Sequence, residues 1–333
     1  MGLGREQGIE EMKKLVEGGD SPVLENCTTC YACNEYCPTG AMPFDLVAAL
    51  QGERNSLKLS KGALQVLEKQ YEPYESSKTA KLPPDGRVLS QCAFLRTHAA
   101  FFEGRPWEGL AKVGGRNFFC NMVYLHTGQI DVVEKRARTI VENFERLGAK
   151  EVVCFHDECY AFFTTYAPAF GVEVPFRVKH ASMHLVEYLK AHEDDIEPLG
   201  LRAAYQRSCS SRLTPQKDRC LDELFRLVGV ERVERKYDGR NALCCQAPTL
   251  QLSSAVDRRL ASREEVKRKR ADARARQQAN VRDALEAGAT AMVFVCPTCL
   301  DTLGKTCEGA GLQPIFFTEL ARMALGELEA TTR

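Results

Sequence analysis

Two stretches of the chain align without a gap, and this internal repeat constrains the fold more than any other feature of the sequence. RLGAKEVVCFHDECYAFF aligns with EAGATAMVFVCPTCLDTL, so that His156 falls on Cys296 and Cys159 falls on Cys299. Chance is a poor explanation for this correspondence, because a repeat of this kind indicates that one supersecondary unit occurs twice. The chain is therefore expected to contain two related halves.

Short apolar runs alternate with longer amphipathic segments from Arg87 onward. In the first half RVLSQC, RNFFC, KEVVCF and VPFRV predict strands, with DVVEKRARTIVENFERLG and HLVEYLKAH among the helices between them. The second half repeats the pattern, with LRAAYQ, NALCC, AMVFV and PIFF as strands and CLDELFRLVG and ELARMALGEL as helices. Strands separated by helices predict parallel sheets, and so an α/β fold with two tandem, pseudo-symmetric halves.

Three segments follow from this pattern. Residues 1–86 form a mostly helical segment that ends in a linker, LEKQYEPYESSKTAKLPPDGR, which is polar and contains prolines. Residues 87–197 form the first α/β domain and residues 198–333 the second. The run REEVKRKRADARARQQANVRD in the second domain predicts a long, strongly basic helix, which is expected to be a solvated helix or a docking surface for an acidic partner.

Charge and composition exclude several classes of function. Lys and Arg number 45, and Asp and Glu also number 45, so no overall basic field attracts nucleic acid. The N-terminal residues lack the apolar core of a signal peptide, and no apolar run is long enough to span a membrane. The chain is expected to be cytoplasmic. Its 15 cysteines in a reducing compartment predict metal ligands or catalytic groups rather than disulfides.

The first cysteine group, in ENCTTCYACNEYCPTG, has the spacing C-x2-C-x2-C-x3-C-P. This run is typical of bacterial [4Fe-4S] ferredoxins, in which a short loop wraps thiolates around a cubane cluster, whereas structural zinc sites more often use two separated C-x2-C pairs. The run predicts a cubane [4Fe-4S] cluster on Cys27, Cys30, Cys33 and Cys37. Either Cys37 or a distant cysteine supplies the fourth ligand, because in two-cluster ferredoxins the fourth cysteine of such a run serves the other cluster.

The second half carries a larger cysteine group, in which two cysteines are adjacent. Ligands gather at the carboxyl ends of strands in open α/β sheets, and five cysteines are expected at such ends: Cys209, Cys244, Cys245, Cys296 and Cys299. Five thiolates exceed the four that zinc or an ordinary cubane needs. A fifth is explained if one sulfur bridges two irons, so the adjacent pair predicts an opened cluster.

The first half carries a smaller set at the equivalent positions, namely Cys92, Cys120, His156 and Cys159. The repeat sets Cys120 against Cys244 and Asn121 against Cys245. Because asparagine supplies no thiolate, the five-sulfur arrangement is not available here. Three thiolates and one imidazole suit tetrahedral zinc or a cluster with one histidine ligand, and an empty structural pocket is the third possibility.

The motif C-x(n)-C-C-x(n)-C-x2-C in tandem α/β halves, behind a ferredoxin-type run, resembles the cysteine-rich CCG family, which includes the B and D subunits of heterodisulfide reductase. The likeness covers residues 87 to about 329, and the N-terminal part resembles the ferredoxin-like C subunit of such enzymes, fused in front. It implies a noncubane [4Fe-4S] cluster held by the five second-half cysteines, which would form the catalytic site. Gln246 stands where the family has glycine.

The resemblance implies an oxidoreductase subunit that passes electrons from the N-terminal cubane to the noncubane cluster, which acts on a thiol, a disulfide or another sulfur compound. The partners would be other subunits of a heterodisulfide-reductase-like complex. They would include a flavoprotein, since this chain has no glycine-rich dinucleotide loop. One alternative is a pure electron-transfer subunit between a flavoprotein dehydrogenase and a quinone-linked partner. Another alternative is a metal-stabilised interaction scaffold.

Overall fold

The computed structural model describes residues 3–73, 78–79, 81–95 and 97–329. Within these residues the α-helices are α1 Arg5–Val16, α2 Pro22–Asn26, α3 Ala32–Tyr36, α4 Pro43–Glu53, α5 Lys61–Tyr71, α6 Ile130–Leu147, α7 Asp157–Ala161, α8 Ala167–Ala169, α9 Ala181–Ala191, α10 Asp218–Leu227, α11 Ala247–Ala255, α12 Arg263–Glu286, α13 Pro297–Gly309 and α14 Phe317–Ala324. The strands are β1 Lys78–Thr79, β2 Arg87–Cys92, β3 Ala111–Gly114, β4 Glu151–Cys154, β5 Arg177–His180, β6 Leu201–Gln206, β7 Val230–Arg232, β8 Ala291–Phe294 and β9 Gln313–Phe316.

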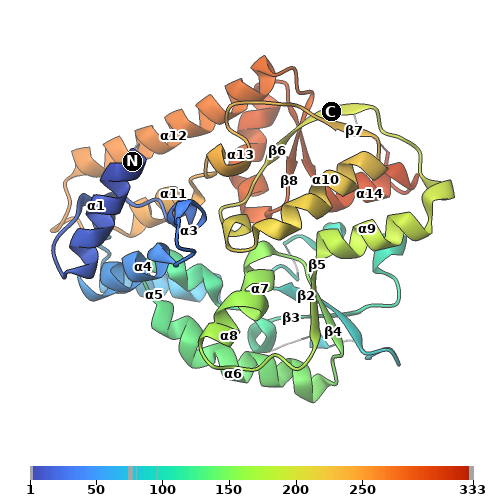
Figure 1. Cartoon of the computed structure of the whole chain (residues 1–333), viewed down its shortest axis with the longest axis horizontal. Helices are drawn as coiled ribbons and strands as arrows, with labels where there is room; N and C mark the ends of the chain where they lie inside the picture. The colour runs from blue at the N-terminus through green and yellow to red at the C-terminus, as the bar shows by residue number, and fades with distance from the viewer. Residues whose placement is uncertain (1–2, 74–77, 80, 96, 330–333) are drawn as a thin grey trace.

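Two sheets with the same strand order form the two halves (Figure 1). The first has the order β1-β3-β2-β4-β5 and the second the order β7-β6-β8-β9. All neighbours pair in parallel except β1, which pairs antiparallel with β3 at the edge of the first sheet. The α/β fold predicted from the sequence is confirmed, and strands β3-β2-β4-β5 correspond one by one to β7-β6-β8-β9.

The second strand of each half does not lie where the sequence predicted it. RNFFC forms a 3-10 turn at Arg116–Phe118 and then a loop, and the strand is β3 just before it. NALCC likewise follows a 3-10 turn at Gly239–Asn241, and the strand is β7. Both cysteine-containing runs are apolar because their loops turn inward and bury side chains such as Phe118 and Cys245, not because they pair in a sheet.

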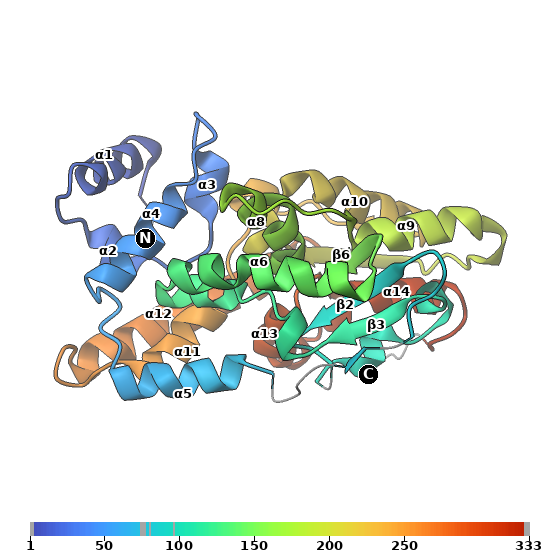
Figure 2. The same ribbon diagram turned by 90° about the horizontal axis from the view of Figure 1, so that it is seen from below.

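The N-terminal helices α1 to α5 lie along one side of the two sheets, where α5 contacts α11 (Figures 1 and 2). Gly52 of α4 lies so close to the loop at Gly128 that a Cβ atom on Gly52 would approach the Gly128 carbonyl oxygen to 2.1 Å. Glycine is therefore required at this contact. In the expected linker, Lys78 and Thr79 form β1, whereas residues 74–77 and 80 lie outside the described residues.

The two halves meet through equivalent elements. Helix α9 follows β5 and helix α14 follows β9, and these two helices are in contact. The rings of His180, at the end of β5, and Phe317 stack with centroids 5.8 Å apart. The ring centroids of Phe155 in the first half and Phe316 in the second half are 5.3 Å apart. The two halves therefore share one hydrophobic core.

None of the helices in the described part of the chain combines the length and the apolar composition needed to cross a membrane.

Candidate functional site

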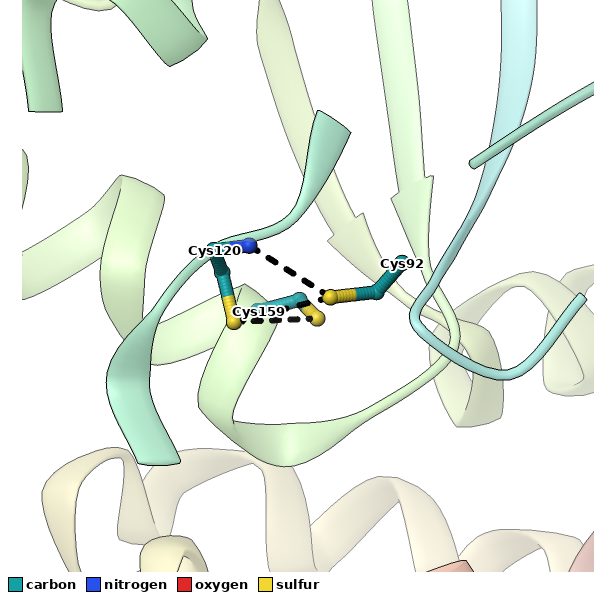
Figure 3. Close-up of side chains that lie close together, drawn as sticks. All are labelled: Cys92, Cys120 and Cys159. Atoms are coloured by element: carbon teal, nitrogen blue, oxygen red, sulfur yellow. Dashed lines mark hydrogen bonds between the residues drawn. The ribbon is translucent and has the colours of Figure 1, made fainter. Parts of the chain in front are cut away.

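Three cysteines of the first half converge in its interior (Figure 3). Cys92 ends β2, Cys120 lies in the loop after β3, and Cys159 is on α7. The Cys120 sulfur is 3.7 Å from the Cys92 sulfur and 3.6 Å from the Cys159 sulfur. All three sulfurs lie within 4.8 Å of one another, and the side chains are buried. We call this group the three-cysteine centre.

The spacing and charge of the three-cysteine centre suit a single thiophilic ion. Ligands 2.3 Å from a tetrahedral zinc ion lie about 3.8 Å apart, which is close to the separations observed. Hydrogen bonding with Cys120 and Cys159 holds the pKa of the Cys92 thiol well below its usual value, although burial opposes this. The backbone amide of Cys120 also donates to the Cys92 sulfur at 3.4 Å. Protein groups alone thus stabilise the Cys92 thiolate at the centre.

His156 is not part of the three-cysteine centre. Its Nε2 atom lies 3.2 Å from the Cys296 sulfur of the second half, and its ring is buried. Burial lowers the pKa of His156, but the charge of Cys296 and the hydrogen bond to it outweigh burial and raise this pKa to about 10. The structure therefore does not bring together the four-ligand set predicted with His156. It brings together the three cysteines and assigns His156 to the second-half group.

The backbone corrects the alignment of the adjacent cysteines by one residue. Asn121 and Gln246 both have left-handed backbone conformations, with φ of 62° and 68°, and both stand immediately before a helix. Their side-chain amides donate to the carbonyl two residues earlier, Phe119 at 2.6 Å and Cys244 at 3.2 Å. Asn121 is therefore equivalent to Gln246 rather than to Cys245. Consequently the residue that the first half lacks is the first cysteine of the pair, which is replaced by Phe119.

The left-handed turn also explains the family's glycine at position 246. Glycine adopts positive φ at no steric cost, whereas glutamine at that position is strained. Gln246 compensates with its side-chain bond to the Cys244 carbonyl, and its backbone amide donates to the Cys244 sulfur at 3.4 Å. The turn that aims the two adjacent sulfurs is thus kept without glycine.

The five second-half cysteines form a connected, buried series. Neighbouring thiols of the series shift one another's pKa, in the pairs Cys209 with Cys244, Cys244 with Cys245, Cys245 with Cys299 and Cys299 with Cys296. The hydrogen bond from Cys299 is the main cause that lowers the pKa of Cys296 to about 5, with the charge of His156 contributing. Among the described residues, no three of these sulfurs gather as closely as those of the three-cysteine centre. A set spread in this way suits a cluster of several irons better than one ion.

A cavity of about 410 Å³ separates the two halves at this series, and we call it the inter-half cavity. Second-half cysteines line one wall: Cys209, Cys245, Cys296 and Cys299. First-half side chains also line the cavity, some aromatic and some titratable: Phe94, His98, Phe119, His126, His156 and Glu158. A cavity of this size, apolar with a few convergent polar groups, is typical of a small-molecule site.

The N-terminal cysteines lie on a tightly turned loop. Thr29 and Tyr31 have φ of 52° and 57°, and the Thr29 amide donates to the Cys27 sulfur at 3.3 Å. Burial raises the pKa of the Cys33 thiol to about 12, whereas the Thr39 side chain lowers the pKa of the half-buried Cys37. Thiolates in this half-buried loop are therefore stabilised by a cation, and a metal cluster supplies one.

Buried charges join the N-terminal loop to the second half. Arg212 follows Cys209 and donates to the Cys30 carbonyl at 3.1 Å and to the Ala242 carbonyl at 2.6 Å. Both Arg212 and Arg207 form ion pairs with Glu35 of α3. Arg212 thereby fixes two loops to each other, the loop that carries Cys30 and the loop that leads to Cys244. These residues could not be singled out from the sequence, since isolated Arg and Glu residues carry no motif.

A second buried polar path runs through the first half. The Thr29 hydroxyl lies 2.7 Å from His126 Nδ1, and His126 Nε2 lies 3.1 Å from Glu158. The other Glu158 oxygen lies 3.8 Å from His156 Nδ1. This path connects the N-terminal cysteine loop to the histidine that contacts Cys296.

A third group of buried charges lies beside His156 at the boundary of the halves. Lys217 pairs with Asp157 at 2.5 Å and donates to Ser211 at 2.9 Å, and His180 lies 3.3 Å from the same Asp157 oxygen. Burial alone would raise the pKa of Asp157, but the charge of Lys217 outweighs it and holds this pKa well below its usual value. Asp157 and Lys217 are fully buried and come from opposite halves.

Comparisons with known proteins agree with the geometry of the second half. The family model described as "Cysteine-rich domain", CCG, matches residues 203–304, which contain all five second-half cysteines. The D subunit of dihydromethanophenazine:CoB--CoM heterodisulfide reductase from Methanosarcina barkeri is 25% identical over 350 residues, which cover 96% of this chain and 80% of that protein. The corresponding D subunit from Methanosarcina acetivorans is 24% identical over 358 residues, with the same coverage.

A solved structure supports the fold alone. The crystal structure of a hypothetical protein from Helicobacter pylori superposes with a TM-score of 0.51 at 10% identity. The match covers 86% of this chain, and the chain spans only 58% of that protein. Residues 203–304 thus match the model of the cysteine-rich CCG domain, and the chain as a whole is similar to heterodisulfide reductase D subunits.

Proposed function

We propose that the chain is an iron–sulfur subunit of a heterodisulfide-reductase-like oxidoreductase. In this proposal it carries electrons between a [4Fe-4S] cluster on Cys27, Cys30, Cys33 and Cys37 and a noncubane-type cluster on Cys209, Cys244, Cys245, Cys296 and Cys299. The observation that carries the proposal is the inter-half cavity, in which four second-half cysteines face a space large enough for a disulfide. The sequence similarity to the heterodisulfide reductase D subunits supports the same class of activity.

The residues around the cavity fit a sulfur substrate. A cluster on these cysteines would supply single electrons and an iron able to take up a thiolate sulfur. Reduction of a disulfide to two thiols takes two electrons and two protons, so the site needs polar groups as well as a redox group. Phe94 and Phe119 reduce access of water, and His156 holds a hydrogen bond on the Cys296 sulfur. A flavoprotein partner in the same complex would supply or receive the electrons.

The decisive test is the response of the protein to a thiol. Anaerobically purified protein, oxidised and mixed with 2-mercaptoethanol, is expected to show a new paramagnetic signal by electron paramagnetic resonance, because a thiolate that binds the open iron alters its electronic state. Iron and sulfide assays on the same sample confirm the loading. A spectrum that is unchanged by thiol, in a sample loaded with iron and sulfide, would contradict catalysis at this site.

We further propose that the three-cysteine centre binds one zinc ion, with a fourth ligand from outside the trio. The sulfur separations of 3.6 and 3.7 Å support a single tetrahedral ion, because they are close to the separation of thiolates that share one zinc ion.

Crystals grown anaerobically are expected to show anomalous scattering at the zinc edge, with one peak within bonding distance of Cys92, Cys120 and Cys159. In Cys159→Ser the peak is expected to disappear while the iron content stays the same, since this cysteine serves no other proposed centre. Iron-edge scattering from several atoms at this position would contradict the assignment.

A further inference from the structure

A second cavity opens between the N-terminal loop and the second half, and we call it the basic cavity. Its volume is about 500 Å³, and both Cys30 and Cys244 line it. These two cysteines belong to different proposed clusters, so both centres are reached from a single opening. Its lining also includes four cationic side chains: Arg212, Lys236, Arg240 and Arg276.

The side chains that line the basic cavity do not balance its charge among themselves. None of the described residues that line it carries a carboxylate. Arg212 is paired with Glu35, whereas within the described part of the chain no carboxylate lies within 4.0 Å of the charged nitrogens of Lys236, Arg240 or Arg276. The whole chain has no net charge, so this positive potential is a local property of one face.

The rim of the cavity is held in place. The exposed ring of Tyr36 lies under the Arg240 guanidinium, with 4.6 Å from its carbon to the ring centroid. The Tyr36 hydroxyl contacts the Arg240 carbonyl and the Asn241 side chain at 3.1 and 3.0 Å, and Arg240 donates to the Glu35 carbonyl at 2.8 Å. Tyrosine and arginine are enriched in protein interfaces, and a rigid pair loses little entropy on binding.

We propose that the basic cavity and its Tyr36–Arg240 rim form the docking surface for an acidic electron-carrier protein. The inference deepens the proposed function and rests on it, because an electron donor needs access to the N-terminal centre. A carrier with carboxylates around its redox centre complements the three unpaired cations, and docking here brings its centre next to the wall formed by Cys30. Charge complementarity of this kind accelerates encounter and orients the partner.

The test measures binding rather than activity. The full chain, loaded with its clusters under anaerobic conditions, is titrated with a purified acidic ferredoxin of the bacterial type by isothermal calorimetry. The double variant Lys236→Glu/Arg276→Glu is expected to raise the Kd about tenfold or more at low ionic strength. The difference is expected to shrink in about 0.5 M salt, where exposed charges are largely screened.

A matched control carries the same change of charge elsewhere. Arg116→Glu/Arg138→Glu alters exposed arginines of the first half, with Arg138 on α6, which runs along the opposite edge of the molecule from α12 (Figure 1). The control is expected to bind with the Kd of the wild type. Equal weakening of the two double variants, or binding that is independent of salt, overturns the proposal. Inorganic phosphate that binds the basic cavity of the wild type, with no binding of the ferredoxin, also overturns it.

Two further measurements separate this inference from the proposed function. Circular dichroism melts show that each variant is folded, and the thiol response in electron paramagnetic resonance is recorded on the same preparations. If the thiol response is present and the ferredoxin does not bind, only the docking surface is wrong.

Discussion

Replacement of Cys245 with serine is expected to abolish the spectroscopic signature of the second-half centre and to leave that of the N-terminal centre. Cys245 is buried and contacts both Cys244 and Cys299, so its loss interrupts the series in the middle. The two centres share no proposed ligand. Iron content is therefore expected to fall by about half, since each proposed cluster holds the same number of irons. Electron paramagnetic resonance and iron analysis on anaerobic samples measure both effects.

Two other cysteine variants complete this experiment. Cys30→Ser is expected to give the reverse pattern, with loss of the N-terminal signal and retention of the second. Cys220→Ser makes the same chemical change at a half-buried cysteine outside every proposed ligand set, and both signals are expected to persist. Loss of both signals in Cys245→Ser, with normal folding, would show that the centres are not independent.

Replacement of Lys217 with methionine is expected to destabilise the protein by about 3–5 kcal/mol, which is the usual cost of leaving one partner of a buried ion pair without its counter-charge. Methionine fills similar space, but Asp157 remains fully buried and keeps its contacts with His180 and Ser211 without the charge of the lysine. Chemical denaturation of the loaded protein, followed by circular dichroism, measures the change.

The double variant Lys217→Met/Asp157→Asn is expected to recover a large part of the loss, because the uncompensated charge is gone. Lys190→Met serves as the control, since Lys190 is half exposed and pairs with Glu223 at 3.0 Å on the surface. Its effect is expected to stay within about 1 kcal/mol. A loss in Lys217→Met no larger than in this control would show that the buried pair does not hold the halves together.

The sequence predicted the elements whose signals are local. The helix α6 was expected from its amphipathic pattern, the long basic helix α12 from its run of charged residues, and β4 and β8 from apolar runs that the repeat set in register. Strands β3 and β7 were not predicted from the sequence, because they are only four and three residues long. Each also contains a charged residue, Lys112 in β3 and Glu231 in β7. The more apolar loops beside them gave the stronger signal, since burial alone does not distinguish a strand from an inward-turning loop.

The site was less predictable because side-chain direction depends on neighbours far away in sequence. The repeat correctly set the backbone of His156 against that of Cys296, and both residues cap a helix in extended conformation. The alignment of the repeat could not predict the direction of the His156 side chain, whose imidazole contacts Cys296 of the other half instead of joining Cys159. The left-handed turns at Asn121 and Gln246 were also hidden, because neither residue is the glycine that normally marks positive φ.

The contact between His156 and Cys296 has a consequence for the origin of the site. Two equivalent positions that touch each other lie near a local twofold axis, as they do in an isologous dimer, where each residue at the axis meets its own copy. The packing of α9 against α14 follows the same relation. The two α/β halves are thus arranged like the subunits of a dimer, joined in one polypeptide and related by approximate symmetry. Fusion lets the two copies of one position differ, so a histidine and a cysteine can face each other where a homodimer would be confined to two identical residues.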